Sequence, residues 1–144
     1  MRGTICVVED DLIIRLWLVR VLEEADFPVV DFDSADRALI HLGRHATGVI
    51  MILTGSHLPG IFDGPDLAQI ASISWPSVTV VVMKDADSVI AEVSVGTIIV
   101  AKPLEDGDVL ASADLAQQRA ELRRNMDRQF SGKRPPEVPT SRPR

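Results

Sequence analysis

The residues best suited to chemistry stand where two short apolar runs end. Glu9, Asp10 and Asp11 follow residues 5–8, and Lys102 follows residues 97–101. Such short runs, rich in β-branched residues, predict strands buried on both faces. In an open α/β sheet, ligands bind just beyond the carboxyl ends of the strands. Clustered carboxylates favour a divalent cation or a lysine as a neighbour, and the alternative is that they only cap the next helix.

The composition predicts one globular domain. The chain has 144 residues, of which 46% are hydrophobic and 25% charged. No run approaches the ~18 apolar residues of a membrane span and no signal-peptide pattern is present, so the expected location is cytoplasmic. Residues 131–144 carry four basic residues and one acid, a net charge of +3. Because the net charge of the whole chain is −6, residues 1–130 carry a net charge of −9. That acidity argues against nucleic-acid binding.

Strand and helix patterns alternate along the chain. Because buried strands that alternate with helices form parallel sheets, we expect an α/β sheet with helices on both faces. The single cysteine, Cys6, falls inside the first strand and is expected to be a buried apolar residue. Residues 131–144 are rich in proline and poor in apolar residues, which predicts a disordered tail. The expected strands are 5–8, 29–32, 49–53, 78–83 and 97–101, and the expected helices are 12–25, 35–45, 66–74, 87–93 and 108–130.

Three motifs at strand ends, taken together, resemble a bacterial response-regulator receiver domain over roughly residues 3–125. They are the run Val-Val-Glu-Asp-Asp at 7–11, Leu-Pro-Gly at 58–60 with Asp-Gly at 63–64, and Ala-Lys-Pro at 101–103. The resemblance implies a flavodoxin-like (βα)5 fold, a three-layer sandwich around a five-stranded parallel sheet. It divides the chain into a receiver-like domain, 1–125, and a helix end with a disordered Pro/Arg-rich tail, 126–144.

The resemblance also implies a chemistry, in which a histidine kinase donates a phosphoryl group to an aspartate beside Mg²⁺. Glu9 and Asp10 match the metal-binding acids, and Lys102 matches the lysine that contacts the phosphoryl group. His57 stands where the family lends a backbone carbonyl to the metal. The phosphoacceptor position falls on Gly55, which has no side chain to phosphorylate.

Two further positions differ from the family pattern. The Ser/Thr that hydrogen-bonds the phosphoryl group is replaced by Lys84, and the aromatic switch residue by Ile99. We expect the Lys84 ammonium to reach Glu9 or Asp10 and, with the loss of a carboxylate at Gly55, to weaken Mg²⁺ binding. No cofactor is then required.

Four polar residues near Gly55 are candidates to replace the missing carboxylate. Asp63 is expected to shape a turn with the glycine after it, and Asp66 to cap the next helix, so neither is favoured as a phosphoacceptor. Ser56 has no base at a suitable spacing. Phosphorylation of His57 has no support in the sequence.

The last helix carries an apolar stripe that continues past the length needed to cover a sheet. The stripe predicts either a frayed end or a contact with a partner, including a second copy of the chain. Its members are Leu115, Leu122, Met126 and Phe130.

These observations favour a stand-alone, degenerate pseudo-receiver in two-component signalling. It would not be an enzyme, and it would act by protein–protein interaction without aspartyl phosphorylation. The expected partner is a histidine kinase, a phosphotransferase or a downstream signalling protein. One alternative is a phosphorylatable regulator that uses a non-standard residue, or an engineered form of an active receiver. The other is a metal-dependent phosphohydrolase with Asp10 as its nucleophile.

Overall fold

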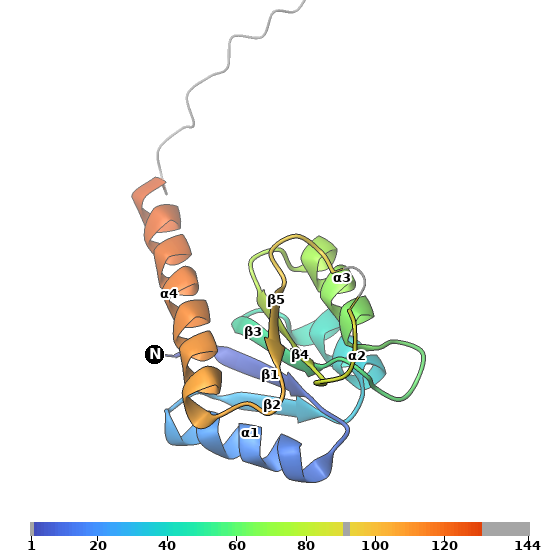
Figure 1. Ribbon diagram of the computed structural model, residues 1–144. Helices are drawn as coiled ribbons and strands as arrows, with labels where there is room; N and C mark the ends of the chain where they lie inside the picture. The colour runs from blue at the N-terminus through green and yellow to red at the C-terminus, as the bar shows by residue number, and fades with distance from the viewer. Residues whose placement is uncertain (1, 91–92, 131–144) are drawn as a thin grey trace, which may run out of the picture.

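A computed structural model describes residues 2–90 and 93–130. These residues form one five-stranded parallel sheet with helices on both faces (Figure 1). The tail, 131–144, lies outside the described residues, so its expected disorder stays a prediction. The strands are β1 (Thr4–Val8), β2 (Val29–Phe32), β3 (Val49–Gly55), β4 (Thr79–Lys84) and β5 (Ile98–Ala101), and the helices are α1 (Leu12–Glu24), α2 (Ala35–His45), α3 (Gly64–Ser74) and α4 (Asp106–Phe130).

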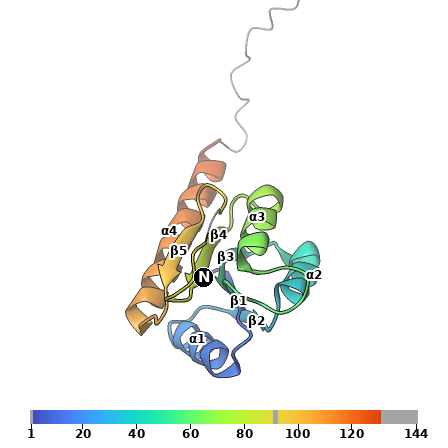
Figure 2. The ribbon, with the colours of Figure 1, turned by 45° about the vertical axis from the view of Figure 1, so that its right-hand side comes forward.

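The strands lie in the order β2-β1-β3-β4-β5, all parallel. This arrangement confirms the expected flavodoxin-like α/β sandwich, with α1 and α4 on one face and α2 and α3 on the other (Figure 2). The chain order places β1 and β3 side by side at the centre. The carboxyl ends of β1, β3, β4 and β5 therefore meet at one edge of the sheet, where the sequence places its acids and Lys102.

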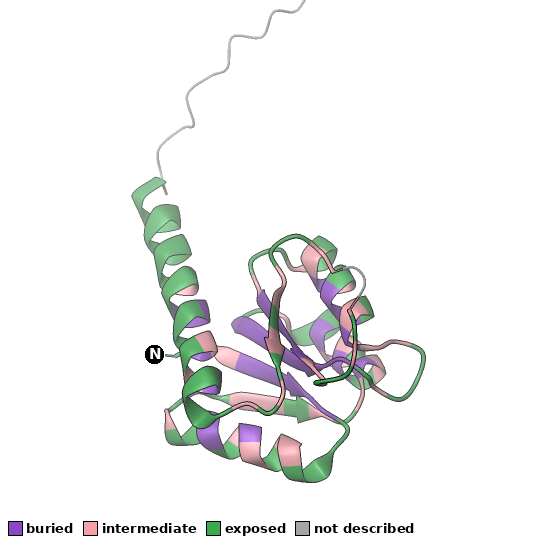
Figure 3. Cartoon of the chain, in the orientation of Figure 1, coloured by how far each residue is buried: buried purple, intermediate pink, exposed green. Residues whose placement is uncertain are grey.

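Two apolar cores follow from the alternation of side chains along the strands. Val7, Leu53 and Met83 point toward α1 and α4, whereas Val8, Ile52 and Val82 point toward α2 and α3. Figure 3 shows these strands as the buried centre of the molecule. A residue's place in this alternation decides which side of the sheet its side chain can reach.

Side chains cap the starts of α1, α2 and α3. The Ser34 hydroxyl accepts from the backbone N–H of Arg37 at 3.2 Å, and Asp11 accepts from the first turn of α1. Asp63 and Asp66 form a reciprocal capping box at α3. Both acids are used locally, as the sequence indicated.

The helix expected over residues 87–93 is wrong for the residues described there. Residues 87–90 and 93 form turns and irregular chain, so the described part holds four helices and not the five of a complete (βα)5 unit. The segment contains Ser88, Val89 and Ile90, which are weak helix formers, and the Ser88 N–H and hydroxyl both bond to the Asp85 carbonyl. A turn after β4 thus takes the place of a helix start.

Leu53 tests the central core directly. It is fully buried in β3 between two neighbouring strands. We expect Leu53→Ala to lower the free energy of unfolding by about 3 kcal/mol, since removing a large buried side chain leaves a cavity. Urea denaturation measures the loss. The matched control, Ile40→Ala on an exposed face of α2, should change stability by no more than about 0.5 kcal/mol, and equal effects would contradict this core.

Candidate functional site

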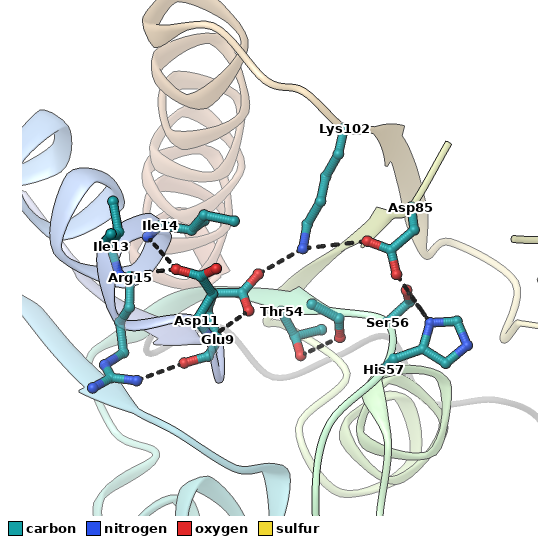
Figure 4. A network of polar contacts seen from close by, with 11 residues as sticks. Glu9, Asp11, Ile13, Ile14, Arg15, Thr54, Ser56, His57, Asp85 and Lys102 are labelled. Atoms are coloured by element: carbon teal, nitrogen blue, oxygen red, sulfur yellow. Dashed lines mark hydrogen bonds and ion pairs between the residues drawn. The ribbon is translucent and has the colours of Figure 1, made fainter. Parts of the chain in front are cut away.

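A buried ion pair joins the two motifs that the sequence singled out. The Lys102 ammonium lies 2.7 Å from Glu9 Oε1, and the Glu9 side chain is only 1% exposed (Figure 4). Glu9 continues the set of β1 side chains that point toward α1 and α4, and Lys102 continues the set of β5 side chains that point the same way. Both side chains therefore project to the same face of the sheet. The ion pair therefore spans from the end of one strand to the end of another, across the position of Gly55.

Gly55 ends β3 directly beneath this carboxylate. A Cβ atom placed on Gly55 would lie 3.2 Å from Glu9 Oε1, tighter than most contacts between real side chains. The Glu9 carboxylate thus fills the space that a side chain at position 55 would occupy. Nearby, a Cβ on Gly64 would lie 2.0 Å from the Gly55 carbonyl oxygen, so the loop after β3 folds back closely onto the site.

Both oxygens of Glu9 are engaged. The second oxygen, Oε2, accepts a hydrogen bond from the Asp11 backbone N–H at 3.0 Å. Burial raises the pKa of Glu9, while Lys102 and the Asp11 N–H act in the opposite direction. For Lys102, burial acts to lower the pKa, but the Glu9 carboxylate and Asp85 outweigh it and leave the pKa raised. Lys102 therefore remains charged at neutral pH.

The three acids of the first motif have separate roles. Glu9 pairs with Lys102, whereas Asp11 caps α1 through the N–H groups of Ile13 and Ile14. Asp10 is exposed. The capping alternative thus holds for Asp11, and the lysine-neighbour interpretation holds for Glu9.

The lysine that neighbours Glu9 is Lys102 and not Lys84. Lys84 makes no ion pair with Glu9 or Asp10 in residues 2–90 and 93–130, so the expected contact is wrong. The reason is strand alternation. Lys84 follows Val82 on the α2 and α3 side, whereas Glu9 extends from the opposite side. Ile99 lies on the same side as Lys84 and is 42% exposed.

Asp85 is a site residue that the sequence reasoning missed. Its carboxylate lies 3.5 Å from Lys102 Nζ through one oxygen and 3.1 Å from His57 Nδ1 through the other. Asp85 comes two residues after Met83, whose side chain points toward α1 and α4. Because side chains alternate along a strand, the sequence could have placed Asp85 on the same face as Glu9. The network runs from Glu9 through Lys102 and Asp85 to His57.

His57 and Ser56 complete the network without forming a hydrolytic relay. Ser56 Oγ and Asp85 Oδ2 both contact the same His57 nitrogen, Nδ1, at 3.3 and 3.1 Å. A relay that activates a serine needs the acid and the hydroxyl on opposite ring nitrogens. The His57 side chain is 73% exposed, and no group of three or more potential metal ligands occurs in the described part of the chain.

Other residues brace the site from outside. Arg15 donates from Nη1 to the Glu9 carbonyl at 2.7 Å and from Nε to Asp31 at 3.1 Å. The Lys102 N–H donates to the Lys84 carbonyl, which fixes the end of β5 against β4. Cys6 is fully buried in β1, and burial raises the pKa of its thiol to about 12, so it is no nucleophile.

Comparison with known proteins identifies the architecture. No protein-family model and no curated protein sequence matches the chain. Solved structures do match. A response-regulator receiver domain protein from Clostridium thermocellum aligns at 19% identity with a TM-score of 0.75, over 83% of this chain and 98% of that one. This is the receiver-domain fold.

Two further structures agree. A response-regulator receiver protein from Sinorhizobium medicae aligns at 20% identity with a TM-score of 0.72, covering 81% of this chain and 95% of the other. The response regulator StyR aligns at 25% identity with a TM-score of 0.76, covering 90% of this chain and 66% of its own. In the receiver fold the Glu9–Lys102 pair lies at the edge of the sheet where ligands bind. No helix in the described residues is long and apolar enough to cross a membrane.

The buried ion pair predicts a pH-dependent cost for removing its cation. We expect Lys102→Met to lower the free energy of unfolding by about 3 kcal/mol at pH 7, because Glu9 would remain charged and buried without its partner. Because the pKa of Glu9 is raised in the folded state, protonation of Glu9 stabilises the folded protein at pH below the ordinary glutamate pKa. This stabilisation is lost as the pH rises through the folded-state pKa. The cost of Lys102→Met should therefore shrink toward pH 4.

Urea denaturation of the single and double variants at both pH values checks this. The control is Glu9→Gln combined with Lys102→Met, which removes both charges and should recover most of the lost stability. A cost for Lys102→Met that is equal at pH 4 and pH 7, or a double variant as unstable as the single one, would contradict the ion pair.

Proposed function

We propose that this chain is a pseudo-receiver, which signals by binding a protein partner and not by accepting a phosphoryl group. The observation that carries the proposal is the Glu9 carboxylate over Gly55, paired with Lys102. A phosphoryl group attached at this edge needs a carboxylate on β3 as the attacking nucleophile. Gly55 offers none, and the space above it already holds a carboxylate that would repel the incoming group.

The same geometry does not fit Mg²⁺. Hard cations need several free oxygen ligands, whereas both Glu9 oxygens already accept from Lys102 and the Asp11 N–H. Asp11 is engaged at the start of α1, and Gly55 contributes no side-chain ligand. We infer that the positive charge of Lys102 balances Glu9 in place of a metal, so that no cofactor is required.

Two alternative functions lose their support. A phosphohydrolase would use Asp10 as its nucleophile, and Asp10 is exposed while the neighbouring acids are engaged with Lys102 and with α1. A regulator that uses a non-standard acceptor would need Asp63 or Asp66, and both form the cap of α3. His57 has a carboxylate neighbour, Asp85, which would repel a phosphoryl group on its Nδ1.

The surface beside the ion pair suits a protein partner. Leu12, Ile13 and Leu16 on α1 are 56%, 80% and 57% exposed, which is unusual for three large apolar side chains on one helix. A separate apolar pocket of about 460 Å³ is lined by Trp17 of the same helix together with Leu104 and Lys102. A partner that enters this pocket would contact Lys102, the cation of the ion pair. Signalling of the two-component type, with a histidine kinase, a phosphotransferase or a downstream protein, is the proposed setting.

Phosphoryl transfer from a small donor tests the proposal. We expect the protein, incubated with acetyl phosphate and Mg²⁺, to show no gain of one phosphoryl group by intact-mass spectrometry, because no carboxylate on β3 can attack. A phosphorylatable receiver domain run in parallel shows that the donor is active. Stoichiometric incorporation that maps to His57, Asp63 or Asp66 would contradict the proposal and favour a non-standard acceptor.

A further inference from the structure

A sizeable groove lies at the opposite edge of the sheet from the ion pair. It is a groove of about 670 Å³ at the amino ends of β4 and β5. One wall is the far half of α4, which continues beyond the sheet in Figure 1, and the other is formed by residues 76–80 and 95–97. The volume falls within the range of pockets that bind small molecules.

The charge of this groove is opposite to that of the chain. Arg119 and Arg123 line it, with Asp127 as the only acid among its described lining residues. Arg123 makes no ion pair within residues 2–90 and 93–130, and Arg119 contacts only the Thr79 hydroxyl, at 3.5 Å. Two guanidinium groups that converge on one groove favour an anion, and above all a phosphate, which they can bind with paired hydrogen bonds.

Hydroxyl groups and apolar atoms complete the lining. Ser72, Ser77, Thr79 and Thr97 line the groove, and the Thr79 side chain is largely buried beneath Arg119. On the side of α4, the apolar stripe noted in the sequence turns toward the groove through Leu122 and Met126, which are 62% and 51% exposed. Polar groups for a phosphate and sugar thus stand beside apolar side chains that could cover a flat ring.

We propose that this groove binds a nucleotide, with its phosphate at the arginines and the flat face of its aromatic base against the apolar side chains. The site is independent of the ion pair at the other edge and of phosphoryl transfer. A second copy of the chain is the competing occupant of the α4 stripe.

A titration followed by amide NMR tests the proposal with three probes: ATP without metal, pyrophosphate and adenosine. We expect ATP to give saturable shifts at Thr79, Gly96 and Thr97, with pyrophosphate and adenosine each binding at least about tenfold more weakly, since each supplies half of the contacts. Arg119→Ala and Arg123→Ala should each weaken ATP binding by about tenfold. Arg128→Ala is the matched control, because it removes the same charge from α4 outside the groove.

Three results would overturn the proposal. The first is the absence of saturable shifts with ATP. The second is an equal loss for Arg128→Ala and Arg123→Ala, which would mean diffuse attraction and no built site. The third is a dimer by sedimentation velocity that Met126→Glu dissociates, which would assign the stripe to a second copy. Saturable ATP binding to a monomer, lost only in the groove variants, supports it.

Discussion

The carboxyl edge of this sheet depends on one buried charge that cannot stand alone. Glu9 is almost fully enclosed, and a buried carboxylate is costly unless a cation and hydrogen bonds compensate it. Lys102 supplies the cation at 2.7 Å, and the Asp11 N–H supplies the second contact. Because Glu9 extends from β1 and Lys102 from β5, the pair also requires the intervening strands to end at the same level.

The same constraint explains why glycine at position 55 suits this site. The Cβ atom of a side chain at position 55 would already stand 3.2 Å from Glu9 Oε1, and a carboxylate attached to it would compete with Glu9 for Lys102. With glycine there, a single carboxylate and a single ammonium fill the space. Asp85 then provides a second anionic contact to Lys102 and links the site to His57 at the surface. The proposed loss of phosphorylation and the proposed independence from metal are two consequences of one ion pair.

The fold could be predicted from the sequence because each strand is a short apolar run and each run ends in recognisable turn or cap residues. Asp63 and Asp66 lie at the start of α3, where a turn and a cap were expected of them. The expected helix over 87–93 failed because nothing in a weak pattern distinguishes a helix from a turn held by local bonds to the Asp85 carbonyl. Only the loop's packing decides between them.

The site could be predicted in part. Glu9, Lys102 and the missing side chain at Gly55 followed from strand ends and from the resemblance to receiver domains. The partner of Glu9 did not, because counting residues from a motif places Lys84 near the site without saying which face it occupies. Period-two alternation assigns Lys84 to the far face and Asp85 to the near one, and it is visible in the sequence once the strand limits are known.

A Mg²⁺ titration followed by amide NMR, continued with beryllofluoride as a phosphoryl mimic, tests the central claim most directly. The claim is that the Glu9–Lys102 pair occupies the place of metal and phosphoryl group. It predicts no saturable shifts at Glu9, Asp10 or Lys102 in the wild-type protein. A Gly55→Asp variant, which places a carboxylate on β3, is titrated in parallel for comparison. Saturable shifts at these three residues in the wild type would show that the pocket still recognises cation or phosphoryl group, and would contradict it.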